Sequence, residues 1–292
     1  MGLKLILSAI YVFAGMLGLE HQLLAAEIQG HRGSRWTHPE NTLPAFQEAL
    51  EAGADVLELD LGMTSDEVLI VSHDEVLNDQ VCRYSDGKPI TQKQILYKMT
   101  AKEAKNFDCG AMINPKFPQQ KTILNTQMPT FDEFLVWLKS NNHPNAKKVI
   151  LNVETKIEKP EEGLTATPEK FAKALAKSLK KHDVVARTVV QSFDFRSLGE
   201  IRKILPKVKI ALLVWEQKWP EIDKAITDYK ADIVSPPFAW LDENIVKEIH
   251  AKKLQVIPWT VNEEKDWQNM IKLGVDGIIT DRPRDLITFL KK

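Results

Sequence analysis

The chain has 292 residues, of which 43% are hydrophobic and 27% are charged, as in an ordinary globular protein. This length is enough for one large domain or two domains of ordinary size. The formal net charge is −1 and no basic tract stands out, so charge gives no indication of binding to nucleic acid or to an anionic membrane surface.

The N-terminal segment has the pattern of a secretory signal peptide. Lys4 supplies a positive charge, an apolar run covers residues 5–19, and small residues precede Glu27. The alternative is an uncleaved membrane anchor, but the run is shorter than the roughly 20 apolar residues that span a bilayer. We therefore expect cleavage of residues 1–26, a mature chain of residues 27–292 in the periplasm or outside the cell, and no stable membrane insertion of that chain.

The first elements predicted for the mature chain alternate between strand and helix. They are a strand over residues 27–31, a helix over 42–53, a strand over 55–61 and an extended segment over 68–71. Asn41 and Thr42 are both candidate caps of the helix. The apolar runs end at or near ionisable residues, which predicts strands whose ends place those side chains at one edge of the sheet.

Residues 75 to about 128 lose this alternation. Asp86-Gly87 and several prolines indicate loops, and one short helix is predicted over 100–106. The segment is too long for an ordinary connection, so we interpret it as an insertion that is functional or covers the core. It contains the only two cysteines, Cys82 and Cys109. Export would permit a disulfide between them, which we favour over the alternative of two separate thiols.

From residue 130 the alternation resumes and continues to the end of the chain. The predicted helices cover 130–140, 167–181, 195–205, 220–229, 242–252, 263–273 and 283–291, and the strands cover 148–153, 188–191, 209–213, 232–234, 255–259 and 277–280. Counted from Glu27, this makes eight strand–helix units. The prediction is one (β/α)8 TIM barrel with a long insertion after the second βα segment.

The alternative architecture is a doubly wound open sheet. Polar residues follow many of the predicted strands, and a barrel would gather all of these strand ends at one mouth, whereas an open sheet would scatter them. The residues are His31, Glu58, Asp60, His73, Glu154, Lys156, Gln191, Trp259–Asn262 and Asp281. This distribution favours the barrel.

Three carboxylates form the strongest candidate for a metal site. Glu58 and Asp60 are two positions apart on a strand and therefore point to the same face. Glu154 ends another apolar strand and would join them at the mouth. Oxygen ligands of this kind suit one divalent cation, Mg²⁺ or Ca²⁺, whereas zinc would require thiolate or clustered histidine ligands. The alternative is a rim of ion pairs between these acids and arginine or lysine.

His31 and His73 are candidates for acid–base catalysis. Each follows an apolar run, and two imidazoles on either side of a reacting centre can act as general base and general acid near neutral pH. Arg32 is suited to phosphate oxygens, and Lys156 could add a second cation. Alternatively, Lys156 forms only a salt bridge at the rim. Together these residues predict a site for a phosphate ester.

The same residues resemble the motifs of the glycerophosphodiester phosphodiesterase family. In chain order the motifs are HRG (31–33), PENT (39–42), LELDL (57–61), SHD (72–74), VETK (153–156), QSFD (191–194), WTVN (259–262) and GVDGIITDRP (274–283). One of them alone would be weak. All eight occur in order between Gln29 and Asp285, which makes the resemblance specific over nearly the whole mature chain.

The resemblance implies a role for each candidate residue. His31 and His73 would be the acid–base pair, Glu58, Asp60 and Glu154 would hold one divalent cation (Ca²⁺ or Mg²⁺), and Arg32, Lys156, Gln191 and Trp259 would bind substrate. The substrate would be a small glycerophosphodiester, cleaved to sn-glycerol 3-phosphate and an alcohol such as choline, ethanolamine or glycerol. The insertion would cover the mouth and shape the glycerol side.

Other functions remain open at this stage. Relatives within the resemblance act on lysophospholipids or sphingomyelin, and the attacking group is water or a substrate hydroxyl. An exported binding protein without catalysis is disfavoured because both histidines and all three acids are present. A barrel aldolase or isomerase would need a Schiff-base lysine. Lys156 is the only candidate, and the neighbouring acids favour a metal instead.

Overall fold

Eight parallel strands form the centre of the fold. The computed structural model describes residues 26–158 and 160–292, so the predicted signal peptide lies, except for residue 26, outside the described residues. The strands are β1 (Glu27–Gly30), β2 (Val56–Met63), β6 (Ile150–Thr155), β7 (Thr188–Ser192), β8 (Lys209–Leu213), β9 (Ile233–Ser235), β10 (Gln255–Val256) and β11 (Gly277–Thr280).

The sheet closes into a barrel. Strand pairing runs in the order β10-β9-β8-β7-β6-β2-β1-β11. Backbone hydrogen bonds then join the two ends of this order, from Asp276 N to Val256 O (2.9 Å) and from Ile279 N to Pro258 O (3.0 Å). The predicted (β/α)8 barrel is therefore confirmed, and the open doubly wound sheet is excluded.

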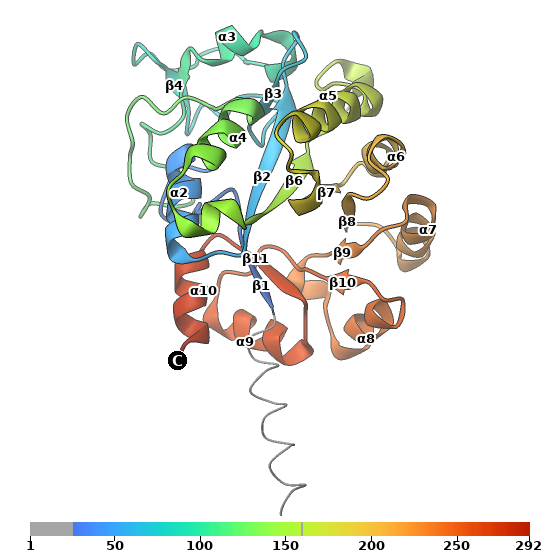
Figure 1. Cartoon of the computed structure of the whole chain (residues 1–292). Coiled ribbons are helices and arrows are strands. Elements are labelled where there is room, and N and C mark those ends of the chain that lie inside the picture. Colours follow the sequence, from blue (N-terminus) through green and yellow to red (C-terminus); the bar gives the residue numbers. More distant parts are fainter. Residues whose placement is uncertain (1–25, 159) are drawn as a thin grey trace, which may run out of the picture.

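Helices surround the strands (Figure 1). They are α2 (Leu43–Ala52), α4 (Phe131–Ser140), α5 (Pro168–Lys181), α6 (Phe195–Ile204), α7 (Trp219–Tyr229), α8 (Glu243–Ala251), α9 (Glu264–Leu273) and α10 (Pro283–Leu290). Short 3₁₀ turns are η1 (Leu96–Lys98), η2 (Pro144–Lys147), η3 (Pro160–Glu162), η4 (Val185–Arg187) and η5 (Phe238–Trp240). Of the two candidate caps of α2, it is Thr42 whose side chain accepts a hydrogen bond from the Ala45 N–H.

Two layers of apolar side chains stabilise the barrel. The larger core lies between strands and helices and includes Leu57, Leu59 and Leu61 on the outward face of β2, each fully buried. A smaller cluster fills the barrel interior and consists of Val189, Ala211, Ile233, Ile257 and Ile279. The alternation along β2 therefore sends leucines outward, while Glu58 and Asp60 point inward.

One prediction about strand ends needs correction. His73 does not follow a barrel strand, because the strand before it, β3 (Leu69–Val71), pairs antiparallel with β2. The register Leu61↔Val71 and Met63↔Leu69 shows that β2 continues beyond the barrel and that β3 returns along it. The local sequence shows an apolar run but not its direction. This return brings His73 back to the mouth.

Residues 75–128 lie between β3 and α4, within the second strand–helix unit (Figure 1). They contain β4 (Arg83–Tyr84), α3 (Ala101–Ala104) and β5 (Phe107–Asp108), so the helix predicted over 100–106 is shorter than expected. They have an apolar cluster of their own, which includes Leu77, Ile90, Leu96 and Phe107.

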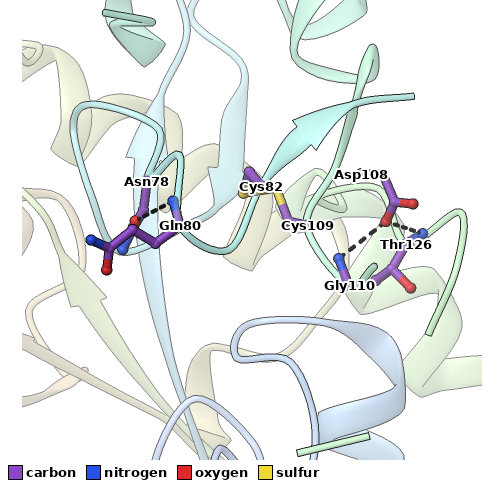
Figure 2. The surroundings of a disulfide bond; sticks show 7 residues. All are labelled: Asn78, Gln80, Cys82, Asp108, Cys109, Gly110 and Thr126. Carbon is purple, nitrogen blue, oxygen red and sulfur yellow. Dashed lines mark hydrogen bonds between the residues drawn. A yellow bond between two sulfur atoms is a disulfide. The ribbon is translucent and has the colours of Figure 1, made fainter. Parts of the chain in front are cut away.

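A disulfide joins Cys82 and Cys109, which decides between the two alternatives left by the sequence (Figure 2). The loop beside it is held by Asp108, whose Oδ1 accepts hydrogen bonds from the backbone N–H groups of Gly110 and Thr126, each 3.1 Å long. Cys82 directly precedes β4 and Cys109 directly follows β5, so the bond lies beside the antiparallel pairing of these two short strands. Within residues 26–158 and 160–292, none of the helices is both long and apolar enough to cross a bilayer.

Candidate active site

A pocket of about 270 Å³ opens at the carboxyl ends of the barrel strands. Seven of the nine predicted site residues line it, namely His31, Arg32, Glu58, His73, Glu154, Gln191 and Trp259. The other two are in contact with this group, because Asp60 belongs to the carboxylate cluster and Lys156 bonds to Glu154. The structure therefore brings together all nine residues, which come from six regions of the sequence.

The GHRG turn after β1 has a backbone that requires glycine at positions 30 and 33. Gly33 has φ +87°, and a Cβ there would lie 2.6 Å from the carbonyl carbon of Ala45. A Cβ on Gly30 would lie 2.4 Å from the carbonyl oxygen of Gly33. Arg32 itself has φ +52°. This tight turn directs the backbone N–H of Arg32 to Glu58 Oε2 at 2.8 Å.

The three acids form one compact cluster. Ligand atoms of Glu58, Asp60 and Glu154 all lie within 4.8 Å of one another, and all three residues are buried. Asp60 and Glu154 are register partners on β2 and β6, which explains why they meet. Burial and the charge of Asp60 raise the pKa of Glu58, and burial also raises the pKa of Glu154. The cluster carries negative charge that is only partly balanced.

Neighbouring side chains balance part of this charge. Lys156 Nζ lies 2.7 Å from Glu154 Oε1, and Arg32 Nε lies 3.3 Å from Asp60 Oδ2. Burial acts to raise the pKa of Asp60, but the positive charges of Arg32 and Lys156 and the hydrogen bond from Asn41 together lower it. The ion pairs considered as an alternative at the sequence level are therefore present. Within the part of the chain that the structure describes, however, Glu58 accepts only from neutral donors, the Arg32 backbone N–H and Gln191 Nε2 (2.9 Å).

The donor set fits a hard divalent cation. All three groups offer oxygen, which is the ligand that Mg²⁺ and Ca²⁺ prefer. Asp60 Oδ1 is buried and has no hydrogen-bond partner among the described residues, although buried oxygens are normally paired. Asn41 fixes the other oxygen, since its Nδ2 donates to Asp60 Oδ2 at 2.8 Å. The unpaired oxygen therefore belongs to a side chain that is held in place, as expected of a ligand.

Two predicted roles become clearer in the structure. Gln191 donates to Glu58 and accepts from Asn152 Nδ2 at 3.0 Å, so it orients an acid of the cluster as well as lining the pocket. Arg32 is held by Glu40, with Nη1 2.7 Å from Oε1. Glu40 of the PENT motif therefore orients Arg32 of the HRG motif.

His31 is oriented by a residue that was not predicted as part of the site. Its Nδ1 lies 2.7 Å from Oδ1 of Asp281, which follows β11 and is 1% exposed. Arg35 and Asn262 also donate to Asp281, at 2.9 Å and 2.7 Å. Burial and the charge of Arg35 lower the pKa of His31 to about 4. His31 is therefore neutral at neutral pH, with Nδ1 as donor to Asp281 and Nε2 as acceptor.

His73 is also held at Nδ1 by a carboxylate, here that of the next residue in the sequence. Its Nδ1 lies 2.6 Å from Asp74 Oδ1, and its Nε2 lies 3.1 Å from Lys156 Nζ. Burial acts to lower the pKa of Lys156, but the negative charges of Glu154 and Asp60 together raise it. Lys156 therefore stays cationic and connects His73 to the carboxylate cluster.

These features define a class of protein. A (β/α)8 barrel that gathers acids, two carboxylate-bound imidazoles and two buried cations at the carboxyl end of its strands has the architecture of an enzyme, because this face of such barrels carries the active site.

Comparison with known proteins also indicates an enzyme and identifies its family. Residues 31–285 match the Glycerophosphoryl diester phosphodiesterase family. A glycerophosphodiester phosphodiesterase of Caldanaerobacter subterraneus is 30% identical over 90% of this chain and 96% of its own length. The human lysophospholipase D GDPD1 is 28% identical over 89% of this chain and 84% of its own.

A crystal structure from Silicibacter pomeroyi, described as a glycerophosphoryl diester phosphodiesterase, superposes with a TM-score of 0.83 at 28% identity. The superposition covers 91% of this chain and 93% of that one. The chain belongs to the glycerophosphoryl diester phosphodiesterase family, and it is an enzyme of the phosphoric diester hydrolase class.

Proposed function

We propose that this enzyme hydrolyses small glycerophosphodiesters to sn-glycerol 3-phosphate and an alcohol. The observation that carries the proposal is the position of two histidines, each with Nδ1 on a carboxylate, in the same pocket as three clustered acids. The family of the chain supports the choice of substrate.

The geometry suggests different parts for the two histidines. His31 is neutral, and its Nε2 can accept the proton of the attacking hydroxyl, which belongs to water or to the substrate. His73, held at Nδ1 by Asp74, is the group on the other side of the pocket, and in this scheme it passes a proton to the leaving alcohol oxygen. One proton is thus taken up and one released in each bond exchange at phosphorus.

We further propose that Glu58, Asp60 and Glu154 hold one divalent cation, Ca²⁺ or Mg²⁺. When bound, the cation would offset negative charge on the phosphate oxygens. Arg32 and Lys156 lie beside the cluster and would bind the same phosphate group from the protein side. Gln191 and Trp259 complete the wall of the pocket.

Product analysis tests the reaction directly. Glycerophosphocholine is incubated with the purified chain and the products are followed by phosphorus NMR. We expect sn-glycerol 3-phosphate and free choline. Phosphocholine and glycerol would show cleavage of the other ester bond, and no product with any glycerophosphodiester would refute the proposal.

A second candidate activity is hydrolysis of lysophospholipids. The name of the human relative and the exposed aromatic residues Phe193, Trp215 and Trp240 favour it. Parallel assays with lysophosphatidylcholine and glycerophosphocholine compare the two substrates. A higher kcat/KM for the lipid would make it the preferred substrate.

We also propose that the enzyme works in the periplasm or outside the cell. The signal-peptide pattern of the sequence supports this location, and so does the disulfide, because such bonds persist in oxidising compartments. Cell fractionation with N-terminal sequencing tests it. We expect an exported chain that begins at Glu27, and a full-length cytosolic chain would contradict the proposal.

A further inference from the structure

Four aromatic side chains stand at the carboxyl ends of four successive barrel strands. Phe193 follows β7, Trp215 follows β8, Trp240 lies in η5 after β9, and Trp259 follows β10. Phe193, Trp215 and Trp240 are 38%, 50% and 39% exposed, so they are large apolar groups left in contact with solvent. The insertion, by contrast, follows β3 in the chain.

The rings form one continuous wall. The centroid of Trp215 lies 5.7 Å from that of Trp259 and 6.4 Å from that of Trp240, with angles of 36° and 15° between the planes. Phe193 meets Trp259 edge-to-face at 5.6 Å. Hydrogen bonds fix two of the indoles, since Trp259 Nε1 donates to Ser235 O and Trp215 Nε1 donates to Glu216 Oε1. The wall is therefore built of held rings, not of scattered surface residues.

The wall borders a shallow, open recess that carries one negative charge. Phe193, Trp215 and Trp259 line it together with Glu216 and Gln217. Glu216 is exposed, and no ion-pair partner for it occurs in residues 26–158 and 160–292. A recess of aromatic faces with one carboxylate at its edge attracts a cation that is weakly hydrated and carries apolar surface.

The recess is continuous with the reacting centre. Phe193 and Trp259 line both the recess and the pocket that contains the two histidines. Phe193 also lies near the proposed phosphate-binding group, with Lys156 Nζ 5.9 Å from its ring centroid. A substrate whose phosphate sits beside Lys156 could therefore extend one of its two alcohol groups along Phe193 and Trp259 into the recess.

We propose that this recess binds the quaternary ammonium group of the leaving alcohol, and so selects choline esters among glycerophosphodiesters. The inference rests on the proposed function of the same site. The methyl groups of a quaternary ammonium contact the ring faces, and its charge interacts with the rings and with Glu216. A neutral acyl chain would gain from the rings but not from the carboxylate, and glycerol would gain little from either.

The test compares glycerophosphocholine with its neutral isostere, in which a carbon atom replaces the quaternary nitrogen. Both esters have the same shape, so the ratio of their kcat/KM values reports the charge alone. We expect the wild type to favour the choline ester by about tenfold. Trp215→Leu should bring the ratio close to one, and Glu216→Gln should lower it by about threefold. Glu221→Gln, which changes an exposed acid in the first turn of α7, is the matched control and should leave the ratio unchanged.

A wild-type ratio near one overturns the inference and leaves the proposed function intact. Equal losses for both esters in Trp215→Leu would also overturn it and would identify an apolar subsite for a neutral group. Trp215 is half exposed, so its replacement should not prevent folding.

Binding of tetramethylammonium, followed by tryptophan fluorescence, gives a second measurement that needs no turnover. If no ester is hydrolysed, the proposed function fails, but this titration still tests the recess. Saturable quenching that Trp215→Leu weakens at least tenfold would support the recess as a cation site, and no saturable quenching would refute it.

Discussion

Asp281→Asn should impair catalysis without disturbing the barrel. Asp281 Oδ1 lies 2.7 Å from His31 Nδ1, and the asparagine keeps the shape of the side chain while removing its charge. A hydrogen bond to a charged group contributes about 1.5–3 kcal/mol. Since about 1.4 kcal/mol corresponds to tenfold in rate, we expect kcat to fall by about 10- to 160-fold. An amide that donates to Nδ1 would also place the ring proton on Nε2, where His31 could no longer act as base.

The assay measures kcat and kcat/KM for glycerophosphocholine at saturating cation, across pH. Asp281 acts to raise the pKa of His31, so the acidic limb of the pH–activity profile should move to lower pH in the variant. The matched control is Asp276→Asn, which changes another histidine–aspartate pair, with His250 Nε2 at 2.8 Å, at the opposite end of β11. A combined His31→Gln and Asp281→Asn variant should be no slower than His31→Gln alone.

Either of two results would refute this role of Asp281. One is a kcat within threefold of wild type. The other is a further loss of activity when Asp281→Asn is added to His31→Gln, because a residue that acts through His31 cannot matter once His31 is gone.

Three further predictions follow from contacts around the site. Arg35→Gln removes a positive charge that lowers the pKa of His31, so the acidic limb of the kcat/KM profile should move from about pH 4 toward 6.5; a limb that stays or moves down would contradict this. Asn41→Ala frees an oxygen of Asp60 and should raise the cation concentration for half-maximal activity by about 10- to 100-fold, whereas an unchanged value would refute the role of Asn41. Serine at both cysteines of the disulfide, which are 27 residues apart, should lower the free energy of unfolding in urea by about 3 kcal/mol; an unchanged midpoint would contradict this.

The sequence was sufficient for the strand–helix order and for most of the site. Apolar runs with a known period predict strands, and the ends of parallel strands meet at one mouth, so the positions of His31, Glu58, Asp60 and Glu154 could be inferred. The pairing Asp60↔Glu154 then follows from adjacent parallel strands.

The contacts between distant residues could not be inferred in this way. His31 and Asp281 are 250 positions apart, and only closure of the barrel between β1 and β11 brings them together. The sequence did show Asp281 at a strand end, which was the one available signal. The contact of Gln191 with Glu58 spans 133 positions and depends on side-chain direction across the barrel. Periodicity describes one element at a time and carries no information on such pairs.

The aromatic wall illustrates a similar limit. The sequence places tryptophans near several loops, but single aromatic residues are more often packed in a core. Only the spatial succession of β7 to β10 shows that Phe193, Trp215, Trp240 and Trp259 form one surface.

The most direct test of the proposed chemistry is the dependence of glycerophosphocholine hydrolysis on a divalent cation. The purified enzyme is treated with EDTA, dialysed, and assayed before and after addition of Ca²⁺ or Mg²⁺, beside an Asp60→Asn variant. We expect chelation to abolish release of sn-glycerol 3-phosphate, either cation to restore it in the wild type, and neither to restore it in the variant. Undiminished release by the wild type after chelation and dialysis would contradict a cation held by the carboxylate cluster.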